Sequence, residues 1–83
     1  MGDKIYEVLS PVMGTFYRAS APDNPPLVEV GQNIKASDML CVIESMKIFT
    51  ELRSEYGGVV KDILVENEDP VMKKQALMII EKE

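Results

Sequence analysis

The sequence contains no histidine and no tryptophan, and its one cysteine is Cys41. Without histidine the chain lacks the commonest general base and the commonest metal ligand, so catalytic serine–histidine and cysteine–histidine pairs are excluded. One cysteine excludes a disulfide within the chain and a cysteine-based metal site. We therefore expect no bound metal, a reducing compartment and no catalytic residue in this chain.

Positive charge and long apolar runs are also scarce. The 83 residues include 9 basic and 14 acidic side chains, for a net charge of −5, which disfavours nucleic acid and anionic membrane surfaces as partners. No apolar run approaches the roughly 20 residues of a membrane-spanning helix. We expect one small domain over residues 1–83 that is monomeric in isolation and binds neither nucleic acid nor membrane.

The chain does contain short segments rich in β-branched residues, separated by turn signals and lacking a helical period. These segments are residues 5–9, 15–18, 27–30, 39–43, 48–52, 59–65 and 76–80. The nearly continuous apolar run at 39–43 is typical of a strand buried on both faces. Residues 35–38 leave room for one helical turn and no more. The spacing predicts an all-β sandwich or barrel.

Proline is concentrated in one stretch. Three of the five prolines lie in residues 19–26 (ASAPDNPP), which excludes this stretch from helix interiors and from paired strands. Its proline rings restrict the backbone before folding as well as after it. We expect a loop here.

The two halves of the chain are weakly similar. Residues 28–44 align with 65–81 at a shift of 37, with five identities in 17 positions, and residues 10–18 align with 54–62 at a shift of 44. The difference of seven residues corresponds to an insertion within the proline-rich stretch. Two similar halves, neither able to bury a core alone, predict a quasi-two-fold domain. Chance similarity among valine-rich strands is the alternative.

Residues 44–48, Glu-Ser-Met-Lys-Ile, join two predicted strands through a tight turn. The central residues of such turns often need a positive φ, which asparagine and glycine adopt most easily. Met46 and Lys47 stand there instead, and a local rule broken at a loop tip indicates function rather than folding. The alternative is an ordinary solvated lysine beside an apolar residue.

This segment resembles the Glu-Ala-Met-Lys-Met attachment motif of the biotin carboxyl carrier proteins, which share a fold family with the lipoyl domains. Residues 10–18 (SPVMGTFYR) are similar to a stretch of the acetyl-CoA carboxylase carriers. Residues 19–26 match the position of an insertion in that group called the thumb, and Gly31 and Gly58 match its turn glycines. The resemblance covers residues 5–81.

The resemblance implies a flattened barrel or sandwich of two four-stranded antiparallel sheets, with quasi-two-fold symmetry and a protruding thumb. It implies biotin attached covalently to Lys47 by a biotin protein ligase. The biotin would carry CO2 as carboxybiotin from the biotin carboxylase to the carboxyltransferase, which makes malonyl-CoA for fatty acid synthesis. The chain would be a non-catalytic carrier in the cytoplasm, or in the plastid stroma if the source is a plant.

Several neighbours of the lysine have both a functional and a structural interpretation. The resemblance assigns Met46 to recognition by the ligase; the structural alternative is that Met46 is a flexible apolar residue at a loop tip. Ile48 is either core or contact, and Glu44 either steers the ligase or covers an exposed strand face. Ser45 and Ile48 depart from the family motif without disturbing the turn, and Glu68 stands where the second half often has glycine.

Outside the motif, two further expectations concern the thumb and the cysteine. In the thumb, the candidates for contact with the biotin ring are Ser20, Ala21, Pro22, Asp23 and Asn24. Cys41, within its apolar segment, is expected to be buried and inert.

Three other functions stay open. A lipoyl domain would have the same fold, although lipoyl sites resemble Asp-Lys-Ala, whereas Lys47 lies between Met46 and Ile48. A carrier of another biotin-dependent carboxylase would usually lack the thumb. An unmodified β-sheet interaction module would gain no group at the lysine.

Overall fold

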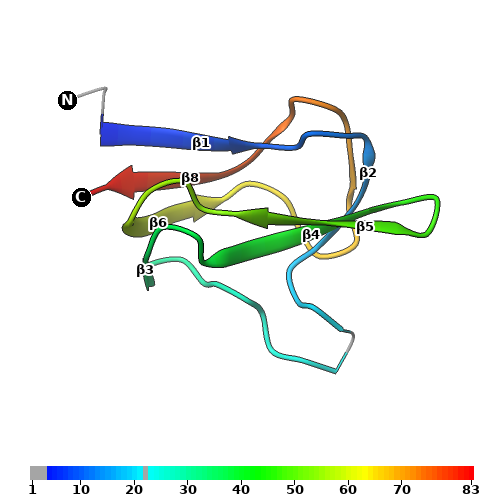
Figure 1. The fold of residues 1–83 in the computed structure, drawn as a ribbon, viewed down its shortest axis with the longest axis horizontal. Coiled ribbons are helices and arrows are strands. Elements are labelled where there is room, and N and C mark those ends of the chain that lie inside the picture. Colours follow the sequence, from blue (N-terminus) through cyan, green and yellow to red (C-terminus); the bar gives the residue numbers. More distant parts are fainter. Residues whose placement is uncertain (1–3, 22) are drawn as a thin grey trace.

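The computed structural model describes residues 4–21 and 23–83, and this part of the chain forms strands and turns without an α-helix (Figure 1). The strands are β1 (Ile5–Leu9), β2 (Gly14–Tyr17), β3 (Asn33–Ile34), β4 (Met39–Ser45), β5 (Ile48–Arg53), β6 (Gly58–Ile63), β7 (Pro70–Val71) and β8 (Ala76–Lys82). They form two four-stranded antiparallel sheets, ordered β1-β8-β6-β3 and β5-β4-β2-β7. The predicted all-β class and sheet composition are confirmed.

The repeat in the sequence relates the two sheets. Exchanging β1–β4 of the first half with β5–β8 of the second converts one sheet order into the other. The turns repeat as well, because Ser10 and Ser54, 44 residues apart, are both buried and each donates its hydroxyl to the carbonyl two residues later. The predicted quasi-two-fold symmetry is confirmed, and chance similarity does not explain such a match.

The hydrophobic core fills the space between the two sheets. Its largest fully buried side chains include Phe16, Leu40, Ile43, Leu77 and Ile80, contributed by both halves. The apolar run at 39–43 becomes β4, in which residues 40–43 are all buried. Cys41 is fully buried there, and burial raises the pKa of its thiol to about 12, so the expectation of a buried cysteine is confirmed.

Two local expectations were wrong. Residues 27–30 form no strand, and pairing resumes only at β3. Residues 35–38 form a non-helical turn. The Asp38 carboxylate accepts the backbone N–H of Lys35 at 2.9 Å, and Ser37 has a φ of 77°, which a helical turn does not allow. Strand β7, which was not among the predicted segments, contains Pro70; an edge strand tolerates proline because it has a partner on one side only.

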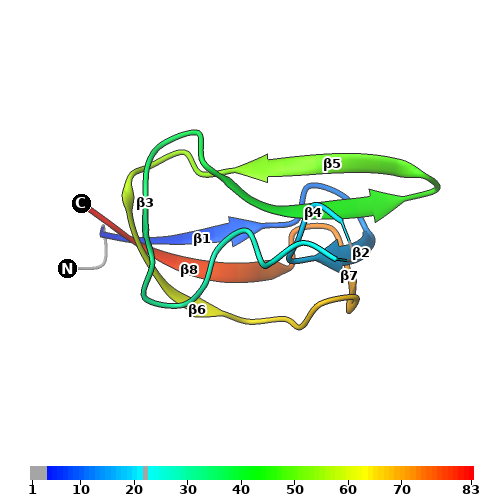
Figure 2. The same cartoon turned by 90° about the horizontal axis from the view of Figure 1, so that it is seen from below.

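The β4–β5 hairpin reaches one end of the molecule, whereas β1 begins and β8 ends at the other (Figures 1 and 2). The molecule extends 38 Å along this axis and 19 Å across its thinnest direction. At the base of the thumb, the Leu27 amide donates to the Arg18 carbonyl at 2.7 Å, which closes the loop of residues 19–26. No helix among the described residues is long and apolar enough to cross a membrane.

Candidate functional site

The turn of the β4–β5 hairpin consists of two residues. Ser45 of β4 pairs with Ile48 of β5, which leaves Met46 and Lys47 at the tip. Their φ values are 53° and 67°, as in a type I′ turn, whose backbone twist matches that of paired strands. Left-handed backbone is unfavourable for residues that carry a Cβ atom, so folding alone does not account for methionine and lysine here.

Glu44 holds the turn closed. Its Oε2 atom accepts a hydrogen bond from the backbone N–H of Lys47 at 2.8 Å. The bond links the end of β4 to the second residue of the turn. The bond fixes the backbone of the lysine and leaves its side chain free to extend. Sequence reasoning did not identify this contact, although a carboxylate three residues before an amide in a tight turn is a recognisable signal.

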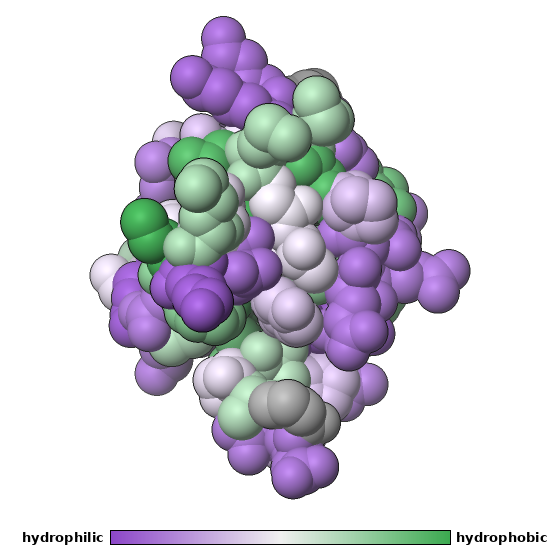
Figure 3. Space-filling view, turned by 90° about the vertical axis from the view of Figure 1, so that its right-hand side faces the viewer, coloured by the Kyte–Doolittle hydropathy of each residue, from purple (hydrophilic) through white to green (hydrophobic). Residues whose placement is uncertain are grey.

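The side chains at the tip project into solvent. Met46 is 90% exposed and Ile48 is 68% exposed, so Ile48 is not a core residue. Lys47 is also exposed, and Ser45 is half-buried where β4 ends. Figure 3 looks onto this end of the molecule, where hydrophobic and hydrophilic residues share the surface. The geometry presents a primary amine beyond the body of the fold, accessible to an enzyme that acylates it.

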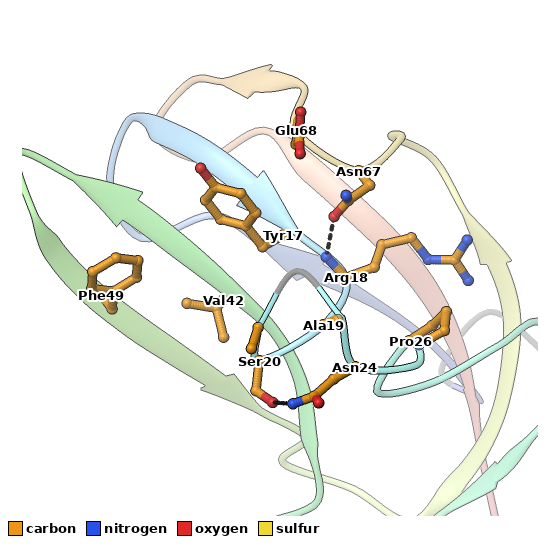
Figure 4. A pocket seen from close by; sticks show the side chains of 11 residues that line it. Tyr17, Arg18, Ala19, Ser20, Asn24, Pro26, Val42, Phe49, Asn67 and Glu68 are labelled. Carbon is orange, nitrogen blue, oxygen red and sulfur yellow. Dashed lines mark hydrogen bonds between the residues drawn. The ribbon is translucent and has the colours of Figure 1, made fainter.

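A cavity of about 440 Å³ lies beside the hairpin and under the thumb (Figure 4). Its walls come from β2, β4, β5, the thumb and the loop before β7, and comprise Tyr17, Arg18, Ala19, Ser20, Ala21, Asn24, Pro26, Val42, Phe49, Asn67 and Glu68. Phe49 belongs to β5 and is two residues from Lys47, so one side of the cavity is close to the tip in sequence.

Val42 shows what the thumb does to this face of the sheet. Its side chain is only 7% exposed, yet it does not belong to the core cluster between the sheets. The corresponding residue of the other half is Ile79, 37 positions later, which is half-buried where no thumb lies over it. The thumb therefore covers an apolar floor that the second half leaves partly open.

Some of the thumb residues that were predicted to contact biotin line the cavity, and others do not. Ser20, Ala21 and Asn24 line the cavity, and Asn24 Nδ2 donates to Ser20 Oγ at 2.8 Å. Asp23 does not line it, and Pro22 lies outside the described residues.

Sequence reasoning missed the opposite wall of the cavity. The Asn67 side chain lies 49 residues from Arg18 in the chain but accepts its backbone N–H at 2.9 Å, and no local pattern indicates such a contact. Phe49 of β5 also lines the cavity, and its side chain is 64% exposed. Within residues 4–21 and 23–83, no group of three acidic, cysteine or histidine side chains could hold a metal ion.

Comparison with known proteins places this geometry in context. A family model described as "Biotin-requiring enzyme" matches residues 6–80. The chain is 47% identical over 73 residues to the biotin carboxyl carrier protein of acetyl-CoA carboxylase from Pseudomonas aeruginosa, covering 88% of this chain and 47% of that protein. A chloroplastic protein of the same name from Arabidopsis thaliana is 39% identical, covering 89% of this chain and 26% of that protein.

Solved structures share the fold. A single-chain, multi-domain long-chain acyl-CoA carboxylase superposes with a TM-score of 0.82 at 18% identity, over 96% of this chain and 7% of the other. The urea carboxylase of Kluyveromyces lactis gives a TM-score of 0.76 at 26% identity, over 92% of this chain and 6% of the other. The chain thus spans about half, or less, of the length of the proteins that it matches.

Proposed function

The chain belongs to the biotin- and lipoyl-attachment family, and from this premise we propose that Lys47 is the residue to which biotin is covalently attached. Residues 1–83 then form one attachment domain of the carrier component of acetyl-CoA carboxylase. The observation that carries the proposal is the exposed lysine held at the tip of a type I′ turn by Glu44. The names of the relatives support biotin rather than lipoate as the attached group.

The reaction at Lys47 is an acyl transfer. Its Nζ atom forms an amide with the biotin carboxyl carbon, while the bond from that carbon to its activating group breaks and the leaving group departs with the electron pair. The Lys47 ammonium loses one proton before it attacks, and the new amide nitrogen loses a second as the leaving group departs; we assign both protons to acceptors in the ligase or to water, since this chain has no histidine. The turn residues contribute presentation: the Glu44 hydrogen bond keeps the backbone of Lys47 fixed while its side chain enters the ligase.

The carrier role follows from tethering. Biotin, when attached, supplies a ureido nitrogen that carries a carboxyl group. Lys47 holds this group on a long arm within reach of a biotin carboxylase and a carboxyltransferase, and tethering raises its effective concentration at both without new binding energy. The residues of this chain take no part in either chemical step that leads to malonyl-CoA. We place the protein in the cytoplasm, or in the plastid stroma for a plant source.

The cavity under the thumb fits the cofactor that we propose. Its apolar floor and aromatic edge, Val42 and Phe49, suit a small bicyclic ring, and the polar thumb residues Ser20 and Asn24 suit the ureido group. A comparison of NMR spectra of the unmodified and biotinylated forms tests this contact. We expect shift changes within residues 19–26 and at Phe49. Changes confined to residues 44–48 would contradict thumb contact while leaving attachment intact.

Intact-mass spectrometry after co-expression with a biotin protein ligase tests the attachment. We expect a gain of one biotinyl group in the wild type and none in Lys47→Arg, which has the same positive charge but no acylable amine. A lipoyl gain, or no gain, contradicts the proposal.

Assignment to acetyl-CoA carboxylase has a separate test. The biotinylated chain should support malonyl-CoA formation when mixed with a bacterial biotin carboxylase and carboxyltransferase, and the unmodified chain should not. Failure here, with biotin attached, would leave the attachment site standing and point to another carboxylase.

A further inference from the structure

Three exposed methionines lie at the hairpin end of the molecule. Met46 is at the tip and 90% exposed, Met13 precedes β2 and is 61% exposed, and Met72 follows β7 and is 62% exposed. Large apolar side chains exposed together indicate an interaction surface, whereas single ones do not. They are far apart in the sequence, with 33 residues from Met13 to Met46 and 26 from Met46 to Met72.

The register of β2 with its two neighbours indicates that the three methionines lie near one another. Gly14 pairs with Val71, and Met13 and Met72 are the residues just beyond this pair. Thr15 pairs with Glu44, and Met46 follows Glu44 by two residues, at the tip of the hairpin beside β2. We call these three side chains the methionine row.

Strand β2 approaches β4 closely at this end. A Cβ atom on Gly14 would collide with the backbone carbonyl of Glu44 and would lie 3.0 Å from the Ile43 side chain. Glycine therefore permits β2 to pack tightly beside β4 near the end of the hairpin, and Met13 is the next residue along the chain. Val12, 37% exposed, extends the apolar surface along the same loop.

The fold does not require apolar residues at these positions. By the shifts of 44 and 37, Met13 corresponds to Gly57 and Met72 corresponds to Lys35. The two corners have matching backbone hydrogen bonds, since Lys74 donates to the Ser10 carbonyl and Ser37 to the Ser54 carbonyl, each at 2.7 Å. The second half thus forms the same backbone hydrogen bond without a methionine at either corresponding position. Packing of the fold therefore does not account for Met13 and Met72.

We propose that the methionine row is the docking surface for the enzyme that acylates Lys47, an inference that rests on the function proposed above. The unmodified amine stands only one flexible lysine stem from the backbone. The acylating enzyme must therefore bring its active site against the turn and contact what surrounds it. Enzymes that act after modification reach the attached group through a longer arm, so their active sites can lie farther from the turn.

The chemistry of the surface defines the partner. Unbranched, polarisable methionines adapt to an apolar patch on a second protein. Lys73 and Lys74, both exposed, follow Met72 directly in a chain whose net charge is −5. The partner is therefore a biotin protein ligase whose apolar contact surface is bordered by acidic side chains, which these two lysines meet.

The test measures biotin transfer to the unmodified protein by a bacterial biotin protein ligase. In the double variant Met13→Gln/Met72→Gln we expect kcat/KM for the carrier to fall about tenfold, through a higher KM at an unchanged kcat. The matched control is Val30→Gln, which replaces a residue that is 59% exposed and three positions before β3. Strand β3 lies at the end of the molecule opposite the hairpin (Figure 1). It should stay within about twofold of the wild type.

Each result decides the proposal. An unchanged KM in the double variant, or an equal loss in Val30→Gln, overturns docking while normal modification of the wild type upholds the attachment site. A loss confined to later carboxyl transfer also overturns it. Should thermal unfolding show that the double variant is misfolded, Met72→Lys replaces it, because the quasi-equivalent Lys35 shows that the corner accepts lysine; KM should then rise about threefold. A wild type that accepts no biotin contradicts the proposed function itself.

Discussion

Neighbouring side chains in this protein differ sharply in their exposure to solvent. Cys41 is fully buried in β4, whereas Met46, five residues later, is 90% exposed. Both were predictable from sequence, because an apolar run predicts a buried strand and a hairpin turn predicts an exposed tip. The hydrogen bond from Lys47 to Glu44 was not, since it depends on one rotamer of a half-buried carboxylate.

The buried thiol predicts how stability responds to alkaline pH. Burial raises the pKa of Cys41 from 9.0 to about 12, so between these values the unfolded chain loses a proton that the folded protein keeps. The free energy of unfolding should therefore fall as pH rises from 9, by up to about 1.4 kcal/mol per pH unit from this group. Urea unfolding at pH 8, 9 and 10 should show a shallower decline in Cys41→Ala than in the wild type. Parallel declines would contradict the assignment to Cys41.

In the β4–β5 hairpin, the residues that the turn conformation favours differ from the residues that the proposed function needs. Its length and position were predicted from residues 44–48, and so was the need for positive φ at its centre. The thumb was predicted as a loop from its prolines, but its role as a cover over Val42 was not. That role depends on contacts between segments far apart in the chain, which no local pattern contains.

Replacing Met46 and Lys47 by the residues that a type I′ turn favours tests whether the native pair costs stability. In Met46→Asn/Lys47→Gly both positive-φ positions are occupied by residues that tolerate them, and the backbone N–H that Glu44 accepts is retained. We expect the free energy of unfolding to rise by about 2 kcal/mol and biotinylation to be lost. Met46→Asn alone should give about half of the gain. A variant less stable than the wild type would show that the methionine and lysine side chains stabilise the turn themselves.

At the scale of the whole molecule, the quasi-two-fold relation organises the fold. Sequence identity between the halves indicated it, and the sheet orders confirm it. The relation also explains most of the unusual backbone, because Gly31 and Glu68, with φ of 92° and 72°, are 37 residues apart, as are Ser37 and Lys74, with φ of 77° and 71°. Met46 and Lys47 are the remaining positive-φ residues in the described ranges, and they form the candidate site.

The symmetry predicts a stabilising substitution. Glu68 has the backbone conformation that its counterpart Gly31 adopts without strain, so Glu68→Gly should raise the free energy of unfolding by about 1 kcal/mol. Glu66→Gly is the control, because Glu66 is also exposed and has no positive φ; it should lower stability by about 0.5–1 kcal/mol. Chemical denaturation of both variants gives the comparison. Two changes of the same sign would mean that strain at Glu68 is negligible.

Tandem mass spectrometry of peptides from the ligase-treated wild-type protein tests the central claim most directly, because it identifies which lysine has been acylated. The chain offers several exposed lysines, including Lys35, Lys61, Lys73 and Lys74, and Lys47 is the one at the tip of the β4–β5 turn. We predict a biotinyl group on the peptide that contains Lys47 and on no other. Biotin on any of the other lysines, or spread among them, would contradict the account.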